Sequence, residues 1–339
     1  MKRLVHSRRQ FLTLGGSAAV SLAAVHTTSA FAQGGPLILK GITPWTADYD
    51  LSKAFFIFQE LVTKKLGGKV IVSFLGGPEV AAPNQQFAAL KNGVVDVLLG
   101  AAAYYRGEVP AAAAVQFTKK KPSELRQSGY YQIMRDLHQK QGGVIYLANT
   151  AGGNKFRIYV KKPLDKPSFS GLKIRVSPVY TPLVTALGGT PVQMAPGDVY
   201  TGLERGVVDG FGWTYTGIDI FGWHEVSKYV IDHPFYSLDG ALLFNANVWN
   251  KLSPDVQAVF EEIGVELEKK VEEYIASQLA KEDERLKKLG LQFIRFSDAD
   301  AEKFVTTAYD AGWKDFIAKN DALFTGTPGL REKLVQLGG

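Results

Sequence analysis

Short apolar runs rich in β-branched residues alternate along the chain with stretches whose apolar residues recur every three or four positions. The short runs predict β-strands at residues 37–40, 70–74, 95–99, 144–147, 156–160, 172–176, 207–210 and 241–244. The helical periodicity predicts helices between many of them, for instance over residues 51–66, 84–92 and 123–140. Strands that alternate with helices indicate an α/β fold, for which we expect largely parallel sheets.

One stretch of the pattern occurs twice. Residues 90–96 and residues 203–209 both read Leu-x-x-Gly-Val-Val-Asp. Each copy is typical of a helix end, a glycine cap and a short strand that begins near an aspartate, Asp96 or Asp209. The same unit is therefore predicted twice, which favours two similar α/β lobes.

Residues 253–289 predict one long helix. Ser253 is a suitable N-cap residue, Pro254 suits the first helical position, and no glycine follows Gly264 until Gly290. A continuous helix of this length reaches roughly 55 Å and would lie across both lobes. A break near Gly264 would give two shorter helices instead. A further helix is predicted over residues 298–319.

The order of these elements predicts how the chain divides. We expect one lobe to contain residues 33–153 plus about 241–279, and the other to contain residues 154–240 plus about 280–339. A chain of 339 residues with 46% apolar residues is long enough for two lobes. It has no cysteine, so disulfides and thiolate metal sites are excluded and the core alone must stabilise the fold.

The N-terminal segment, residues 1–32, has the order of an export signal. Its charged part is followed by an apolar run of small residues over 11–25 and by an A-x-A cleavage pattern at 30–32, with no acidic residue in the segment. Residues 7–12, Ser-Arg-Arg-Gln-Phe-Leu, resemble a twin-arginine signal. An ordinary Sec signal with two adjacent arginines is the alternative. In either case we expect a mature protein that works in the periplasm and is not inserted in the membrane after cleavage. The basic residues of the segment are Lys2, Arg3, Arg8 and Arg9.

Removing this segment changes the charge argument. The net charge of the whole chain is +6, and the four basic residues of the signal leave only about +2 for the rest. No later segment combines a Lys/Arg cluster with interleaved aromatic residues, so nothing predicts binding to nucleic acid.

Enzyme signatures are largely missing. The three histidines after the signal, His138, His224 and His233, share no metal-ligand spacing, and no nucleophile elbow or P-loop occurs. The pair Gly210 and Gly212 lacks the third glycine of a dinucleotide fingerprint. We therefore predict no enzyme, no cofactor and no metal, and an exported enzyme of unknown class stays the alternative.

Arg175 is the first candidate binding residue, since it lies near the end of the predicted strand 172–176. Ligands of open α/β sheets bind beyond the carboxyl ends of strands, and a guanidinium there offers a planar fork suited to a carboxylate. A surface position or a structural ion pair is the alternative for any single arginine.

The sequence around Arg175 resembles a known family. It reads Gly-Leu-Lys-Ile-Arg-Val at 171–176, Leu-Gly-Gly-Thr-Pro-Val-Gln-Met at 187–194, Asp-Val-Tyr-Thr-Gly-Leu at 198–203 and Gly-Val-Val-Asp-Gly at 206–210. This order is similar to the signature of the DctP-like substrate-binding subunits of TRAP transporters, with Asp198 and Gly202 where Glu and Ala are common. The resemblance implies a two-lobed, type II-like periplasmic binding protein that captures a small organic acid and delivers it to the TRAP permease. A binding protein that serves a sensor kinase is the alternative.

The resemblance also implies site residues. Arg175 matches the carboxylate-binding arginine of the family, and a second basic residue often comes from the crossover strand about twenty positions earlier. Lys155 and Arg157 both lie there, and residues two apart on a strand share a face. Both could line the cleft, and we prefer Arg157 for its planar fork.

The chain departs from the family pattern after Gly210, where it continues Phe-Gly-Trp-Thr-Tyr. Gly212 stands where oxoacid-binding members place a carboxylate that can ligate a metal, so no bound metal is predicted. Trp213 matches a position that contacts ligand in relatives, and Trp45, Tyr104 and Tyr105 follow strand ends and are expected to face the cleft. These aromatic rings predict a ligand with an apolar or aromatic body behind its carboxylate.

Overall fold

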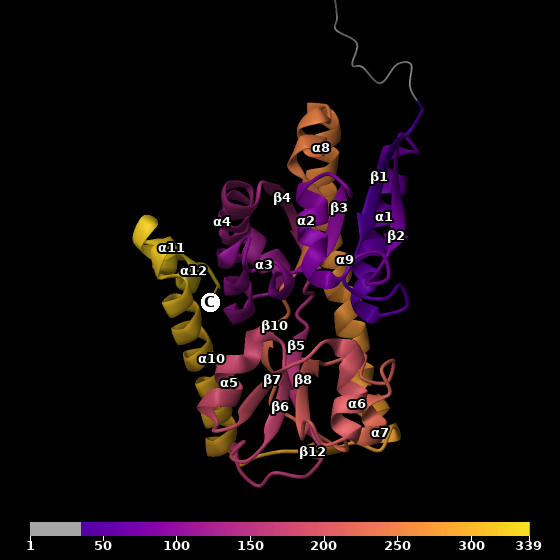
Figure 1. Cartoon of the computed structure of the whole chain (residues 1–339). Coiled ribbons are helices and arrows are strands. Elements are labelled where there is room, and N and C mark those ends of the chain that lie inside the picture. The colour runs from indigo at the N-terminus through magenta and orange to yellow at the C-terminus, as the bar shows by residue number, and fades with distance from the viewer. Residues whose placement is uncertain (1–34, 339) are drawn as a thin grey trace, which may run out of the picture. The chain divides into compact units, whose positions relative to one another are not determined.

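The computed structural model of the chain describes residues 35–338, which belong to one compact unit (Figure 1). The expected export signal at residues 1–32 lies outside the described residues. Within the described part of the chain, no helix is both long and apolar enough to cross a membrane.

Two sheets organise the described residues, and we call the part built on each sheet a lobe. The first lobe has the strand order β2-β1-β3-β11-β4. These strands are β1 (Leu37–Ile42), β2 (Val70–Gly76), β3 (Val97–Ala101), β4 (Val144–Asn149) and β11 (Gly240–Asn245). The accompanying helices are α1 (Lys53–Leu66), α2 (Gln86–Lys91), α3 (Pro122–Gln127), α4 (Tyr130–Leu137) and α8 (Ala246–Lys251). The helix predicted over residues 123–140 is interrupted at Gly129, whose φ of 90° ends the first helix and starts the second.

The second lobe has the strand order β12-β9-β5-β8-β6-β7, and β10 pairs with β5 off this path. Its strands are β5 (Lys155–Val160), β6 (Lys173–Val176), β7 (Thr190–Gln193), β8 (Gly210–Thr214), β9 (Tyr229–Ile231), β10 (Phe235–Ser237) and β12 (Gln292–Ile294). Its helices include α5 (Thr181–Ala186), α6 (Val199–Glu204), α7 (Trp223–Val226) and α10 (Asp298–Lys319).

The sheets are mixed, and the prediction of largely parallel sheets is wrong. β1 runs parallel to β2 and β3, and β6 runs parallel to β7 and β8, as the alternation with helices requires. However, β11 runs antiparallel to β3 and β4, and β5 runs antiparallel to β8 and β9. These antiparallel strands are the ones through which the chain passes from one lobe to the other.

The repeated sequence unit forms the same local structure in both lobes. Gly93 and Gly206 have φ values of 73° and 70° after α2 and α6. The carboxylate of Asp96 accepts from the backbone N–H of Lys40 at 2.7 Å, and that of Asp209 accepts from Lys173 at 2.9 Å. In each pair the amide of the aspartate also donates to the carbonyl of the same lysine. The aspartate therefore fixes the start of β3 against β1 and the start of β8 against β6.

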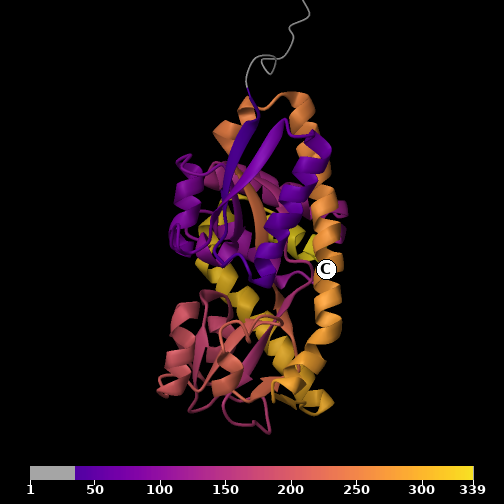
Figure 2. The same ribbon diagram turned by 90° about the vertical axis from the view of Figure 1, so that its right-hand side faces the viewer.

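Helix α9 (Pro254–Lys288) is continuous and runs along both lobes (Figures 1 and 2), as predicted. Gly264 does not break it. A Cβ at that position would lie 2.7 Å from the carbonyl oxygen of Leu147, so the glycine lets β4 approach the helix closely. The buried Glu268 binds Arg126 of the first lobe, and Asp283 binds Arg157 of the second. Helix α9 is therefore bound to each lobe by an ion pair.

The C-terminal helices α11 (Asp321–Gly326) and α12 (Leu330–Gly338) follow α10 back toward the first lobe. The amide of Lys119 donates to the carbonyl of Gly338 at 3.0 Å, and the ammonium of Lys120 donates to that of Leu337 at 2.9 Å. The end of the chain, expected with the second lobe, therefore makes its hydrogen bonds with the first. The bounds of the two lobes stay a prediction.

Candidate functional site

A cavity of about 540 Å³ lies where the carboxyl ends of the parallel strands of both sheets meet. From the first lobe it is lined by Trp45 and Leu51 after β1, residues 82–84 after β2 and Tyr104 after β3. From the second lobe it is lined by residues 175–180 at the end of β6, residues 193–196 at the end of β7, and residues 213–214 at the end of β8. Both sheets therefore place loops at the edge where open α/β sheets bind ligands.

Arg175 lies in this cavity wall with 2% of its surface exposed. Its Nε and Nη2 both donate to the carbonyl oxygen of Met194, at 3.0 and 2.8 Å, and its Nη1 donates to the hydroxyl of Tyr180 at 2.8 Å. All of these acceptors are neutral, and the described residues place no carboxylate within ion-pair distance of it. A desolvated cation without a counter-ion, held rigidly at a cavity, is a ready site for an anion.

Gly212 leaves room for the ring of Tyr180. A Cβ at position 212 would overlap the tyrosine ring, and the hydroxyl of Tyr180 donates to the carbonyl oxygen of Gly212. The position at which the resemblance implies a carboxylate in oxoacid-binding members is thus closed by an aromatic ring that also hydrogen-bonds Arg175. Among residues 35–338 no group of three His, Asp or Glu side chains is placed to hold a metal ion.

Trp213 also lines the cavity, and it links the two lobes. Its indole Nε1 donates to the hydroxyl of Tyr49 in the first lobe at 2.8 Å, and the guanidinium carbon of Arg175 lies 5.3 Å from its ring centroid. Gly217 has a φ of 91°, and a Cβ there would overlap the ring of Tyr49. The glycine therefore makes room for the tyrosine, whose burial raises its pKa above the usual range despite hydrogen bonds to Thr214 and Trp213.

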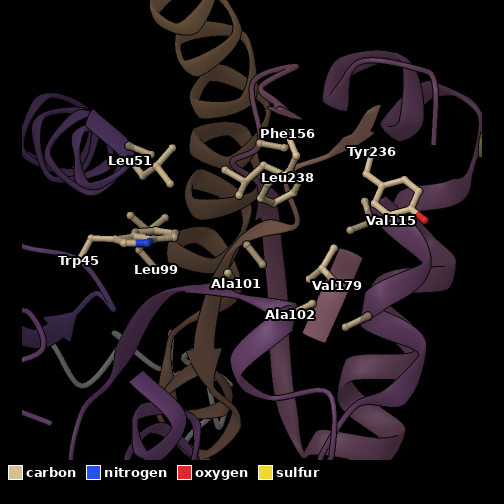
Figure 3. Close-up of a cluster of buried hydrophobic side chains, with 14 of the residues drawn as sticks. Trp45, Leu51, Leu99, Ala101, Ala102, Val115, Phe156, Val179, Tyr236 and Leu238 are labelled. Carbon is tan, nitrogen blue, oxygen red and sulfur yellow. The ribbon is translucent and has the colours of Figure 1, made fainter. Parts of the chain in front are cut away.

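The rest of the cavity wall is mainly apolar. Trp45, Leu51, Phe156 and Leu238 come from segments of both lobes (Figure 3). Tyr104 lines the cavity beside them, and burial raises the pKa of its hydroxyl to about 12, although the charge of Arg175 opposes the rise. Apolar walls around a few polar groups are typical of sites for small organic ligands.

Arg157 and Lys155 are not among the residues that line the cavity. Arg157 is as buried as Arg175, but its Nη2 binds Asp232 at 2.7 Å and its Nη1 binds Asp283 at 3.3 Å. These carboxylates come from the loop after β9 and from α9. The second basic residue expected at the ligand is thus engaged in a structural ion-pair cluster.

Tyr105 is likewise not in the cavity wall. Its ring stacks on Phe87 at 4.7 Å between centroids, and its hydroxyl lies 3.2 Å from Nε2 of His138. Burial lowers the pKa of His138 to about 4, so the histidine is neutral at pH 7 and forms part of the first-lobe core. Of the seven predicted site residues, the structure brings four together at the cavity: Arg175, Trp213, Trp45 and Tyr104.

Asp239 lines the cavity and was not predicted. It precedes β11, which runs antiparallel to β3 with Gly240 opposite Ala101. The beginning of β11, and not its end, therefore lies at the ligand-binding edge. Asp239 precedes a predicted strand and does not follow one, so the rule of strand ends does not find it. A prediction that this strand crosses between the lobes would have indicated it.

Comparisons with known proteins agree with this geometry. The DctP family, bacterial extracellular solute-binding protein family 7, matches residues 43–320. A solute-binding protein of Albidiferax ferrireducens is 25% identical over 281 residues, 78% of this chain and 80% of the relative. The C4-dicarboxylate-binding periplasmic protein DctP of Rhodobacter capsulatus is 26% identical over 272 residues, 75% of this chain and 78% of that protein.

The fold has close counterparts among solved structures. The crystal structure of a TRAP periplasmic solute-binding protein from Desulfovibrio salexigens with bound orotic acid has a TM-score of 0.77 and 19% identity. The structural match covers 88% of this chain and 99% of that protein. This likeness confirms the predicted two-lobed α/β fold. Because the family match spans most of the sequence, the chain belongs to the DctP family, family 7 of the bacterial extracellular solute-binding proteins.

Proposed function

We propose that this protein is the periplasmic binding subunit of a TRAP transporter and captures a small monocarboxylate with an apolar or aromatic body. Arg175 anchors the carboxylate, Trp213, Trp45 and Tyr104 pack against the body, and the loaded protein delivers the ligand to the membrane permease. The observation that carries the proposal is a buried guanidinium that lies at a cavity and has only neutral partners.

The charge of the cavity wall supports one carboxylate and not two. Arg175 is the one cationic residue among the described residues that line it, whereas Arg157 is bound to Asp232 and Asp283 outside the wall. A second buried carboxylate would have no cation to face and would pay the full cost of desolvation. The acid bound by the Desulfovibrio relative, orotic acid, is a single carboxylate on a flat ring. The cavity volume of about 540 Å³ falls within the usual range of small-ligand sites.

Export is part of the same proposal. The basic, apolar and A-x-A order of residues 1–32 supports secretion, and Arg8 and Arg9 support the twin-arginine route. Cleavage would release the binding protein into the periplasm, where its permease partner can reach it. The family places such chains outside the cytoplasm.

Calorimetric titration of the mature protein with aromatic and aliphatic monocarboxylates tests the proposal. At least one aromatic acid should bind with micromolar or better affinity, and Arg175→Ala should weaken it about 100-fold, which corresponds to about 3 kcal/mol. Lys173→Ala is the matched control, since this lysine lies on the same strand and is exposed. Equal affinities of the Arg175→Ala variant and the wild type would contradict the assignment of Arg175. Binding of short dicarboxylates alone would contradict the ligand class.

A further inference from the structure

Asp239 is the second charged residue in the wall of the cavity. It lies between β10 and β11, on one of the segments by which the chain crosses between the lobes, and 2% of its surface is exposed. Apart from Arg175, no other charged side chain occurs among the cavity-lining residues of the described chain. The cavity wall therefore carries one buried cation, contributed by the second lobe, and one buried anion, contributed by the crossing.

The described residues use only part of the hydrogen-bonding capacity of the Asp239 carboxylate. Its Oδ2 accepts from the backbone N–H of Ala103 at 2.8 Å and from the side-chain amide of Gln116 at 2.6 Å. The carboxylate also accepts from the backbone N–H of Asp239 itself. An ionised carboxylate offers about four lone-pair positions, so it can accept a further donor. Because Asp239 lines the cavity, a ligand there can supply that donor.

The surroundings of Asp239 favour its ionised, hydrogen-bond-accepting form. Burial raises the pKa of Asp239, but the hydrogen bonds from Gln116, from Ala103 and from its own backbone N–H and the charge of Arg106 oppose the rise. The lone pairs that these donors leave unused can accept from a ligand.

Arg175 and Asp239 line the same cavity of about 540 Å³, and Tyr104 lines it as well. A ligand that fills this cavity and packs against Tyr104 can therefore contact both the guanidinium and the carboxylate.

We propose that Asp239 is a specificity-determining residue that selects, among the monocarboxylates anchored by Arg175, those that carry a hydroxyl or amino group remote from the carboxylate. This inference rests on the proposed function and names its ligand class more narrowly, as hydroxy or amino acids with an apolar body. A donor on the ligand hydrogen-bonds the carboxylate of Asp239, whereas a ligand without one shields the carboxylate from water, offers it no donor and loses affinity.

The experiment compares acids that differ only in the donor. The probes are 3-phenylpropanoate and its 4-hydroxy derivative, phenylacetate and its 3- and 4-hydroxy derivatives, and hexanoate with 6-hydroxyhexanoate and 6-aminohexanoate, each titrated into the mature protein by calorimetry. In at least one set the acid with the donor should bind tenfold or more tightly than its parent. Asp239→Ala should reduce this ratio to below threefold, because it removes the acceptor and puts no NH₂ group in its place from which a ligand hydroxyl could accept.

Gln116→Ala is the matched control. It removes the same hydrogen bond to Oδ2, but Gln116 does not line the ligand cavity, so the variant should lose stability and keep the tenfold ratio. If acids bind through Arg175 but every hydroxy or amino acid stays within threefold of its parent, the inference is wrong and the proposed function stands. The same holds if Asp239→Ala keeps the ratio. If no acid of any set binds the wild type, both the inference and the proposed function are wrong.

Discussion

Arg157 and Arg175 are two equally buried arginines of one sheet, on β5 and β6 with β8 between them. Both contact aromatic rings. Trp213 of β8 is the register partner of Arg157, and the same Trp213 ring lies 5.3 Å from the guanidinium of Arg175. Neither the type of residue nor the burial distinguishes them.

Their partners distinguish them. Arg157 binds two carboxylates, Asp232 and Asp283, so its charge is neutralised within the fold. Arg175 donates only to carbonyl and hydroxyl oxygens, so its charge is oriented and not neutralised. A cation that the fold positions without a counter-ion is available to a ligand, whereas a paired cation is part of the architecture.

The pairing also explains where each arginine acts. Asp283 belongs to α9, and Asp232 follows β9, so Arg157 ties the long helix to the second sheet. Arg175 hydrogen-bonds Met194 and Tyr180, which lie in loops at the cavity, and Gly212 within β8. It therefore connects the segments that form the ligand-binding edge. In the proposed function, Arg157 thus stabilises the fold and Arg175 binds the ligand.

The largest expected effect comes from Arg157→Ala. It leaves Asp232 and Asp283 without their shared cation, so we expect the free energy of unfolding to fall by about 3 kcal/mol. The same change at Arg175 removes only bonds to neutral acceptors and should cost about 1 kcal/mol. Urea titration of both variants measures the difference.

Ligand affinity should show the opposite order. Folded Arg157→Ala protein should bind the best acid within threefold of wild type, because Arg157 does not line the cavity. A loss of affinity as large as that of Arg175→Ala, with an unchanged free energy of unfolding, would show that Arg157 serves the ligand after all.

Gly212→Ala tests how Arg175 is oriented. The added methyl group must displace the ring of Tyr180, whose hydroxyl accepts from Arg175 and donates to the carbonyl of residue 212. We expect a loss of about 2 kcal/mol in stability from overpacking, together with weaker ligand binding by about tenfold. Thermal unfolding and calorimetry measure the two effects.

Gly197→Ala is the control for that substitution. Gly197 lies beside the cavity loop, its added Cβ would meet nothing within 4 Å, and its φ is not positive. It should leave both stability and affinity unchanged. Wild-type affinity in the Gly212→Ala variant would mean that Tyr180 does not orient Arg175.

Much of the fold could be predicted from the sequence because its signals are local. The copies of Leu-x-x-Gly-Val-Val-Asp each hold the helix end, the glycine and the aspartate within seven positions, and both form the expected unit. The periodicity of α9 is equally local, and the helix is continuous. The short strands β7, β9, β10 and β12, of three or four residues each, were missed because such short runs carry little periodic signal. β6 is as short but was predicted, because Leu172, Ile174 and Val176 alternate with two basic residues. The strand predicted at 207–210 begins only at Gly210 and runs to Thr214.

The roles of the two arginines could not be predicted in the same way. Asp232 and Asp283, which occupy Arg157, lie 75 and 126 positions away along the chain. No local pattern reports such partners. Arg175 was found because its function follows from a strand end, which is local, and Asp239 was missed because its place depends on the direction of β11. Local patterns thus predicted the secondary structure, whereas long-range ion pairs decide which buried charged residue is available to a ligand.

Arg295→Gln gives the smallest expected effect and tests the ion pairs around Arg157. Arg295 also binds Asp232, with its Nε 2.9 Å from Oδ2, but 69% of its side chain is exposed. Water competes for such a pair, so in the wild type we expect the melting temperature to change by no more than about 2 °C.

In the Arg157→Ala background, Arg295 becomes the remaining ion-pair partner of Asp232 among the described residues, and the same substitution should lower the melting temperature further. Equal shifts in both backgrounds would mean that the two arginines act on Asp232 independently, and the large effect of Arg157→Ala would then have to arise from Asp283.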